Sequence, residues 1–237
     1  MDIASIIDHT YLDPRCESGA VEKLCAEAAE FGFHSVCVNP CEIARAARLL
    51  AGTGVAVCSV ADFPFGAGTW AAKAFECRDC IAEGAGEVDL VANTSELLQA
   101  SGSPAARARL LCEMRGLVDS VRDSKPDAVL KLILECCRLT EKAIAVGSEL
   151  AAAAGFDFAK TSTGFGTGGA TLEAVRIMRA AAGPDIGIKA AGGIRSLDAA
   201  LAMCAAGATR LGCSAGVSIV REAAVRAKAG GPARSGN

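Results

Sequence analysis

Residues 151–164 read AAAAGFDFAKTSTG, and this stretch contains the repeating unit from which the fold can be predicted. A run of alanines typical of a helix stops at Gly155, and a short apolar run follows that ends in Lys160 and a Ser/Thr/Gly loop. Glycine is common just past a helix end. A short apolar run bounded by turn signals is typical of a strand buried on both faces. The stretch therefore predicts a helix followed by a buried strand.

The same pattern recurs along the chain, with Pro126 in place of glycine once, and the opening IIDHT adds one more strand. We predict strands at 6–10 and near 35–39, 55–61, 87–93, 129–135, 156–162, 186–191 and 209–213. Buried strands that alternate with helices indicate a parallel sheet. Eight such units in 237 residues favour an α/β fold, a (β/α)₈ TIM barrel, as a single domain over residues 1–229. A doubly wound open sheet is the alternative, but it would normally carry its glycine-rich turn after the first strand.

Composition excludes several classes of protein. The chain has 24 Lys and Arg against 27 Asp and Glu, with no long basic run, so no nucleic-acid partner is expected. Neither a signal peptide nor a stretch long enough to span a membrane is present, which predicts a cytoplasmic protein without a membrane partner. The last residues, 230–237, are expected to form a disordered tail.

The chain has 12 cysteines but is not a short secreted sequence, so we expect reduced thiols rather than a disulfide framework. Cys25, Cys112 and Cys204 occur at spacings typical of a helix core. Cys77 and Cys80 form a CxxC within a predicted helix, with no second pair at metal-binding spacing. With only two histidines besides, no metal site is predicted.

Ionisable residues inside the predicted strands are the main functional signal; they are Asp89, Lys131, Lys160 and Lys189. In 129–135 the leucines share one face, and Lys131 and Glu135 share the other. If the leucines pack against the helices, the charges point into the barrel, where they must compensate one another. For Lys131 and Glu135, simple pairing inside the barrel is as good an explanation as catalysis.

Lys160 and Lys189 differ from these because each comes directly before a glycine-rich loop, at the strand end where barrels place catalytic residues. Two neighbouring ammonium groups repel, so the pKa of one amine falls and that amine becomes a nucleophile. A neutral amine forms a Schiff base with a carbonyl compound, and a carboxylate such as Asp89 can transfer the protons. These three residues predict an amine-nucleophile enzyme, without deciding which lysine reacts.

The loops after the last three strands, TSTGFGTGGAT (161–171), AAGGIRS (190–196) and GCSAG (212–216), are rich in glycine and lead into predicted helices. Free backbone N–H groups at helix N-termini bind phosphate, and barrels often form such a site after strands seven and eight. The loops therefore predict a phosphorylated substrate.

With these features in place, the sequence resembles the deoxyribose-phosphate aldolase family. The resemblance covers about nine tenths of the chain and is carried by segments that occur in the family's order: IDHTYLDP (7–14), SVCVNP (35–40), FPFGAGT (63–69), EVDLV (87–91), KLILE (131–135), FAKTSTGFGTGGAT (158–171) and the long segment from GIKAAGGIR to GCSAG (187–216). It implies a class I aldolase that needs no metal or other cofactor and that interconverts 2-deoxy-D-ribose 5-phosphate with D-glyceraldehyde 3-phosphate and acetaldehyde.

The resemblance also implies roles. Lys160 would form the Schiff base, Lys189 would perturb its pKa and exchange protons, and Asp89 would transfer protons. Residues at phosphate-binding positions are Gly164, Gly192, Gly193, Gly212 and Ser214, and residues at pocket-lining positions are Asp8, Thr10, Cys37 and Lys131.

One departure from the family is Ala215, which replaces a hydroxyl and implies weaker phosphate affinity. Two alternatives stay open at this point: another Schiff-base lyase acting on a different phosphorylated aldehyde, and a barrel that binds sugar phosphates without catalysis. The mean hydropathy of +0.34 favours a homodimer or a higher homo-oligomer.

Overall fold

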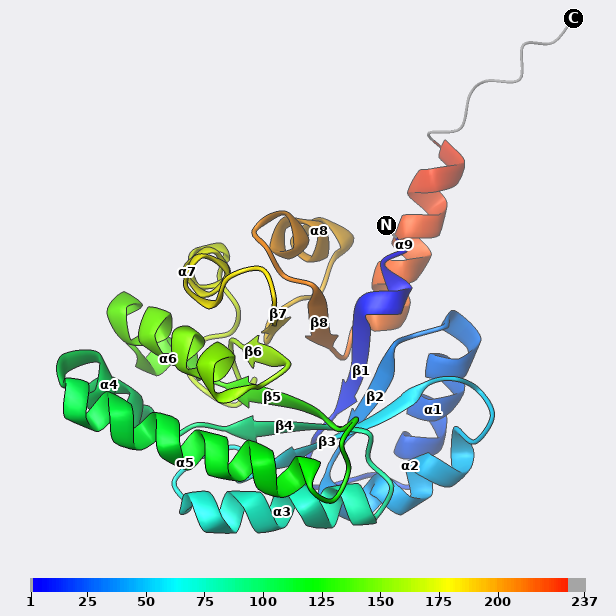
Figure 1. Cartoon of the computed structure of the whole chain (residues 1–237). Helices are drawn as coiled ribbons and strands as arrows, with labels where there is room; N and C mark the ends of the chain where they lie inside the picture. Colours follow the sequence, from blue (N-terminus) through cyan, green and yellow to red (C-terminus); the bar gives the residue numbers. More distant parts are fainter. Residues whose placement is uncertain (1, 230–237) are drawn as a thin grey trace, which may run out of the picture.

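The computed structural model describes residues 2–229, and its strands form one closed, parallel barrel in chain order (Figure 1). The strands are β1 (Ile7–Tyr11), β2 (Ser35–Val38), β3 (Ala56–Ala61), β4 (Glu87–Val91), β5 (Val129–Ile133), β6 (Phe158–Lys160), β7 (Gly187–Ala191) and β8 (Arg210–Cys213). The barrel closes where β1 pairs with β8, with Asp8 opposite Gly212. The predicted (β/α)₈ fold is confirmed, and the open-sheet alternative is wrong.

Helices surround the barrel (Figure 1). They are α1 (Ala20–Phe31), α2 (Ile43–Leu49), α3 (Trp70–Ala82), α4 (Thr94–Gly102), α5 (Pro104–Arg122), α6 (Glu141–Ala154), α7 (Leu172–Ala182), α8 (Leu197–Ala205) and α9 (Gly216–Ala229), with short 3₁₀ turns at Ala4–Ile6, Pro40–Glu42 and Cys136–Arg138. Two helices, rather than one, connect β4 to β5. Ser103 ends α4 and its hydroxyl accepts from the Ala106 N–H, while Pro104 starts α5 at a position where its missing N–H costs nothing.

Several predicted strands are shorter than their apolar runs, because the residues after them make local hydrogen bonds instead. The side chain of Asn93 accepts from the N–H groups of Ser95 and Glu96, and this cap starts α4 two residues after β4 ends. Side-chain bonds such as those of Asn93 compete with the sheet for backbone donors. At Glu135 the cause differs: its backbone lies in the left-handed region, which ends the run that begins with β5.

The two faces of each strand are divided as the sequence predicts. Leu130, Leu132 and Leu134 are fully buried in the apolar core that the helices cover, whereas Lys131 points into the barrel and is equally buried. One core prediction is wrong: Cys112 is exposed on α5 rather than packed in the core. Its neighbours Leu110 and Met114 supply the buried face of that helix instead.

All twelve cysteines lie within residues 2–229 and none is in a disulfide there; their reduced state stays a prediction. Cys77 and Cys80 lie within α3, and burial raises the pKa of Cys80 to about 11, which is typical of an inert core thiol.

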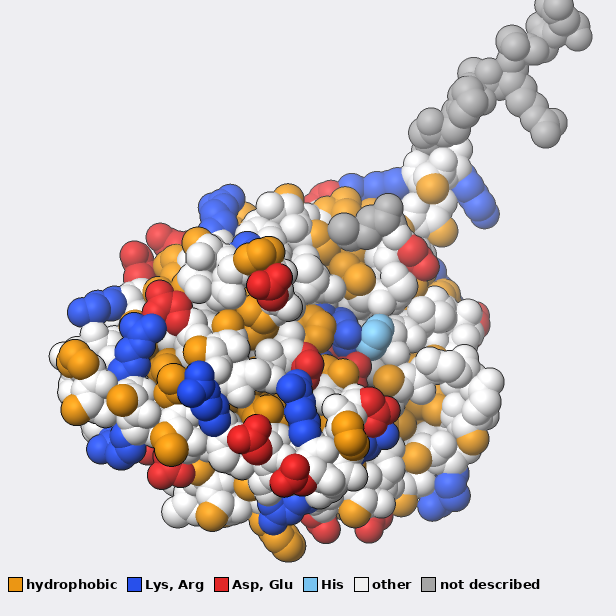
Figure 2. Space-filling view, in the orientation of Figure 1, with side chains coloured by type: hydrophobic (Ala, Val, Ile, Leu, Met, Phe, Trp, Pro, Cys, Tyr) orange, Lys and Arg blue, Asp and Glu red, His pale blue; other side chains and the backbone are white. Residues whose placement is uncertain are grey.

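No helix within residues 2–229 has the length and apolarity required to cross a bilayer. Acidic and basic side chains are interspersed over the face seen in Figure 2. The predicted tail, 230–237, lies outside the described residues, so the domain boundary at residue 229 stays a prediction.

Candidate active site

Asp89 is the centre of a buried charge cluster inside the barrel. One oxygen, Oδ2, lies 2.7 Å from Lys160 Nζ and 2.6 Å from Lys189 Nζ, and Oδ1 lies 2.8 Å from Lys131 Nζ. Lys160 and Lys189 are register partners on β6 and β7, as their sequence positions predict. In the sequence Lys160 is 71 positions from Asp89 and Lys189 is 100 positions from it, so closure of the barrel is what brings these charges together.

A second layer of charges lies below this cluster. Asp8 is 2.5 Å from Lys189 and 2.9 Å from Arg210. Glu87 is 2.6 Å from Lys131 Nζ and 3.0 Å from Arg210. The buried charges therefore alternate in sign from the catalytic end of the barrel downward, which is the compensation that buried ions need.

This alternation fixes the ionisation states. Burial by itself would raise the pKa of Asp89, but the ammonium groups of Lys131, Lys160 and Lys189 hold it well below the usual value. Burial would likewise lower the pKa of Lys189, yet Asp8 and Asp89 raise it. The carboxylate of Asp89 is therefore ionised at neutral pH, and Lys189 is an ammonium.

The same pairing predicts how stability depends on pH. Burial opposes ionisation of Glu87, but Lys131 and a hydrogen bond from His34 lower its pKa from 4.5 to about 2. Because the pKa is lower in the folded state, this stabilisation is complete above pH 4.5 and disappears as the pH falls toward 2. Glu87 alone then accounts for a loss of about 3 kcal/mol in the free energy of unfolding. Urea denaturation between pH 7 and pH 2.5 measures it, and a free energy that stays constant below pH 4.5 would contradict the pairing.

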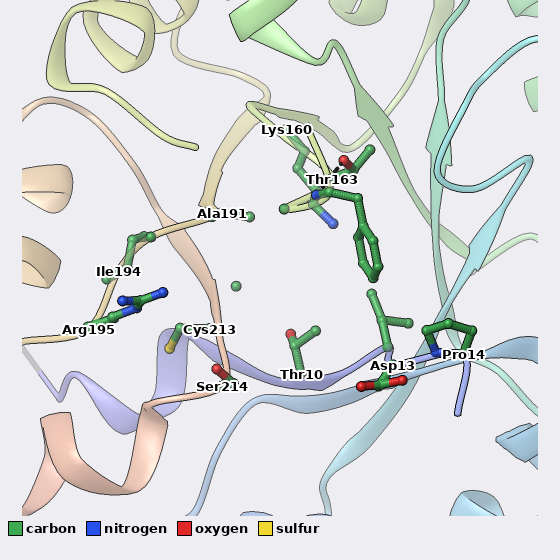
Figure 3. Close-up of a pocket in the computed structure, with 16 residues that line it drawn as sticks. Thr10, Asp13, Pro14, Lys160, Thr163, Ala191, Ile194, Arg195, Cys213 and Ser214 are labelled. Atoms are coloured by element: carbon green, nitrogen blue, oxygen red, sulfur yellow. Dashed lines mark hydrogen bonds between the residues drawn. The ribbon is translucent and has the colours of Figure 1, made fainter. Parts of the chain in front are cut away.

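A cavity of about 360 Å³ opens above the charge cluster, at the carboxyl ends of the strands. In Figure 3 Lys160 and Thr163 lie on one side of it, Ile194 and Arg195 lie on another, and Ser214 lies below them. The amine of Lys160 and the guanidinium of Arg195 both point toward the space between them (Figure 3). The cavity therefore has an amine at one side and a cation with glycine loops at the other.

The glycine loops at this second side pack too closely for larger residues. A Cβ atom on Gly169 would lie 2.2 Å from the carbonyl oxygen of Gly192, and Gly192 itself has a φ of 92°. The Ala170 N–H donates to the Gly192 oxygen at 3.0 Å, which joins the loops after β6 and β7. Helix α8 starts just beyond, where Ser196 caps the Ala199 N–H. Glycine loops of this kind next to a helix N-terminus are the ordinary setting of an anion site.

The structure brings most of the predicted site residues to this cavity. Those that line it are Lys160, Thr10, Gly164, Gly192, Gly193, Gly212 and Ser214. Asp8, Cys37 and Lys131, which we expected to line the pocket, are fully buried below it. Lys189 lies in the middle of β7 rather than at its end, and its side chain is 1% exposed against 4% for Lys160. Of the two lysines, Lys160 is the one that lines the cavity.

Sequence reasoning missed three polar residues that line the cavity: Asp13, Thr163 and Arg195. Thr163 and Arg195 each follow a predicted strand within one of the glycine-rich loops, and Asp13 lies just after the first predicted strand. Lys131 and Glu135, for which pairing inside the barrel and catalysis were equally good explanations, do not pair with each other. Lys131 pairs with Asp89 and Glu87, whereas the Glu135 carboxylate turns toward Thr163. The left-handed backbone at Glu135 takes its side chain out of the strand alternation.

Two groups of buried side chains come close enough to share a cation: Cys37, Cys58 and Asp89, and Asp8, Cys58 and Glu87. The ammonium of Lys131 already lies between them, 3.3 Å from the Cys58 sulfur and within 2.8 Å of both Asp89 and Glu87. A metal would have to displace it, and a lysine nitrogen in that position satisfies the carboxylates as a metal would. The residues present do not fit a resident metal ion.

A fully buried carboxylate shared by lysines, next to a cavity lined by glycine loops and Arg195, is the arrangement that an amine-dependent barrel enzyme would need. The comparisons agree with this class. The family model described as DeoC/LacD family aldolase matches residues 3–224. The chain is 48% identical to the deoxyribose-phosphate aldolases of Clostridium perfringens and of a Geobacillus species, over 92% of this chain and 93% and 95% of theirs. The protein belongs to the DeoC/LacD family of aldolases.

Solved structures show the same fold. The deoxyribose phosphate aldolase of Aeropyrum pernix, described as a tetramer, is 32% identical with a TM-score of 0.82, covering 94% of this chain and 91% of that one. An aldolase named QR15 is 34% identical with a TM-score of 0.85, covering 98% of this chain and all of the other. These relatives support the barrel and the family, while the roles of individual residues depend on the geometry above.

Proposed function

We propose that this protein reversibly cleaves 2-deoxy-D-ribose 5-phosphate to D-glyceraldehyde 3-phosphate and acetaldehyde through a Schiff base on Lys160. One observation carries the proposal: Lys160 is the lysine that both contacts Asp89, at 2.7 Å, and lines the cavity that ends in the glycine loops. Relatives at 48% identity that carry this activity in their names support the choice of substrate.

The reaction follows from the positions of these groups. The neutral amine of Lys160 adds to the C1 carbonyl and loses water to form an iminium ion. A base removes the proton of the C3 hydroxyl, and the C3–O bond becomes a carbonyl as the C2–C3 bond breaks. The C2–C3 electron pair becomes the C1–C2 double bond, and the iminium π pair moves onto nitrogen, which gives the enamine. D-Glyceraldehyde 3-phosphate leaves, the enamine is protonated at C2, and water releases acetaldehyde and the free amine. The iminium serves as the electron sink, which is the purpose of covalent catalysis.

Asp89 and Lys189 are the groups placed to handle the protons. The Asp89 carboxylate contacts both amines, so it can pass protons to and from the reacting atoms next to Lys160. Lys189 stays an ammonium because Asp8 and Asp89 hold its charge. Its ammonium group lies beside Lys160, on the same oxygen of Asp89.

The phosphate is bound at the other end, by backbone N–H groups of the loops that contain Gly164, Gly192, Gly193, Gly212 and Ser214, with Arg195 as the nearby cation. The loop with Ala215 still offers its N–H groups and the Ser214 hydroxyl.

Gly193 allows a test of the phosphate site with a matched pair of substitutions. Its φ is 81°, and a Cβ atom added to it would have no atom within 4 Å; both Asn and Asp tolerate this backbone region. Gly193→Asp adds a negative charge next to the phosphate, whereas Gly193→Asn adds the same bulk without it. We expect KM for deoxyribose 5-phosphate to be at least about tenfold higher in the Asp variant than in the Asn variant. Unphosphorylated deoxyribose should show no such difference in KM. An equal rise in KM for both substrates would show that these loops do not bind the phosphate.

The reaction itself is tested by incubating the purified protein with deoxyribose 5-phosphate and measuring acetaldehyde directly as its hydrazone. We expect acetaldehyde to form at the same rate with and without EDTA, because the amine chemistry needs no metal. Binding of the sugar phosphate without any acetaldehyde would support the non-catalytic barrel. Loss of activity in EDTA that zinc restores would support a metal-dependent lyase.

We also propose that the protein assembles as a homo-oligomer in the cytoplasm. The free state of all twelve thiols suits a reducing compartment, and the related Aeropyrum pernix enzyme is described as a tetramer. Light scattering coupled to size exclusion gives the oligomeric state, and a monomeric mass would overturn this part of the proposal.

A further inference from the structure

Glu135, directly after β5, holds a backbone conformation that is unusual for its residue type. Its φ and ψ are 57° and 61°, in the left-handed region where glycine is the ordinary choice. Its side chain is also buried, with 4% of the residue exposed. A charged, non-glycine residue in such a position is kept in place by its surroundings, and these cases concentrate at functional sites. The contacts of its carboxylate indicate what this conformation serves.

The carboxylate of Glu135 is directed at the loop that follows Lys160. The hydroxyl of Thr163 donates a hydrogen bond to Oε2, and the Thr163 backbone N–H donates to Oε1 at 3.4 Å. The thiol of Cys137 donates to the same Oε1 at 3.6 Å. Gly166 closes the space around it, since a Cβ there would lie 3.2 Å from Oε1. Glu135 therefore fixes both the backbone and the side chain of Thr163.

The hydrogen bonds of the Thr163 hydroxyl can be fully assigned. A hydroxyl has one proton and two lone pairs. Its proton is donated to Oε2 of Glu135, and one lone pair accepts from the Phe165 N–H at 3.0 Å. One lone pair is left, and Thr163 lines the cavity together with Lys160. Toward a bound ligand, Thr163 can only be an acceptor.

We propose that Glu135 is a positioning residue that determines substrate specificity: it makes Thr163 an obligate hydrogen-bond acceptor, which selects a phosphorylated aldehyde bearing a hydroxyl group. In Figure 3 Thr163 lies beside Lys160, across the cavity from Arg195. A substrate whose carbonyl carbon is at Lys160 and whose phosphate is at the glycine loops has a hydroxyl group between these two ends, on the side of the cavity where Thr163 lies. The inference rests on the proposed function, and it adds the reason why a hydroxylated acceptor is preferred to its deoxy analogue.

The substitution Glu135→Gln reverses this polarity with almost no change in shape. The backbone N–H of Thr163 can only donate, so it takes the amide oxygen of the glutamine. The amide NH₂ then faces the hydroxyl, which must accept from it as well as from the Phe165 N–H. The hydroxyl proton is left to point into the cavity, so a substrate hydroxyl can no longer donate to Thr163 and must turn to accept from it. Thr163→Val removes the hydroxyl altogether, and Thr163→Ser keeps it.

The experiment measures condensation with acetaldehyde and compares D-glyceraldehyde 3-phosphate with 3-oxopropyl phosphate, which lacks only the hydroxyl. The readout is the ratio of kcat/KM for the two acceptors. We expect Glu135→Gln and Thr163→Val each to narrow this ratio by roughly five- to tenfold, the effect of one hydrogen bond. Thr163→Ser should retain the ratio, and adding Glu135→Gln to Thr163→Val should narrow it no further.

A merely structural role for Glu135 predicts a different result. Glu135→Gln would then lower kcat/KM for both acceptors by the same factor, or its effect would add to that of Thr163→Val, and either outcome overturns the inference. If Glu135→Gln does not fold, an unchanged ratio in Thr163→Val overturns it independently. Failure of the unmodified protein to condense either acceptor with acetaldehyde would instead contradict the proposed reaction, so the two failures are distinguishable.

Discussion

Replacing Lys160 with alanine is expected to lower kcat/KM for deoxyribose 5-phosphate on the order of 10⁶-fold, as removal of a covalent nucleophile does in other enzymes. Lys160 lines the cavity, whereas the other lysines that contact Asp89 lie below its floor. Neither of them can therefore take over the addition to C1. A steady-state assay of acetaldehyde release measures the loss.

Two control variants separate the loss of the nucleophile from the loss of charge and from the removal of any lysine. Lys160→Arg keeps a cation next to Asp89 but cannot form an iminium, so it should be as inactive as the alanine variant while remaining more stable. Lys142→Ala removes an exposed lysine at the start of α6 and should leave the rate unchanged. Substantial activity in Lys160→Arg would mean that the residue acts through its charge alone.

The second large effect is expected for Asp89→Asn. This change removes the carboxylate that three buried ammonium groups share, and an unpaired buried charge costs about 3–5 kcal/mol of stability. It also removes the group placed for proton transfer, which contributes roughly 10²–10⁴-fold to a rate. We expect imine formation to persist while carbon–carbon cleavage slows by that factor. Urea denaturation and rapid-quench kinetics give the two quantities separately.

Glu87→Gln is the matched control for Asp89→Asn. Glu87 lies two residues earlier on β4 and also contacts Lys131, at 2.6 Å, but unlike Asp89 it makes no contact with Lys160. The Glu87→Gln substitution should lower the free energy of unfolding while changing the rate of carbon–carbon cleavage no more than a few-fold. If Glu87→Gln slows cleavage as much as Asp89→Asn does, the cluster acts as a structural unit and Asp89 has no special part in proton transfer.

The barrel could be predicted from the sequence because every strand is buried on both faces and is preceded by a clear stop. The AAAAGFDFAK stretch shows this well, since the helix ends at Gly155 and β6 follows within three residues. The ends of the strands could not be predicted from apolarity alone. At Asn93 a side-chain cap replaces the sheet, and at Glu135 a left-handed backbone turns the chain; neither is visible in a hydrophobic pattern.

The site, like the fold, could be predicted from the sequence only in part. Asp89, Lys160 and Lys189 stood out because charged residues are rare in buried strands. The depth of each side chain along the barrel axis could not be predicted from the sequence pattern. Asp8 and Lys131 were therefore expected in the pocket but lie below it. Register across neighbouring strands sets that depth, and it depends on how the whole barrel closes. For the same reason the sequence could not decide between the two lysines, whereas their positions on β6 and β7 favour Lys160.

The most direct test of the account is borohydride reduction of the protein during turnover of deoxyribose 5-phosphate, followed by mass spectrometry of its peptides. We expect an N-ethyl group on Lys160, in the peptide that contains FAKTSTGFG, which is the reduced iminium of acetaldehyde. The adduct should be absent without substrate and absent in Lys160→Ala. An adduct on Lys189, or turnover with no trapped adduct on any lysine, would contradict the assignment of Lys160 as the nucleophile.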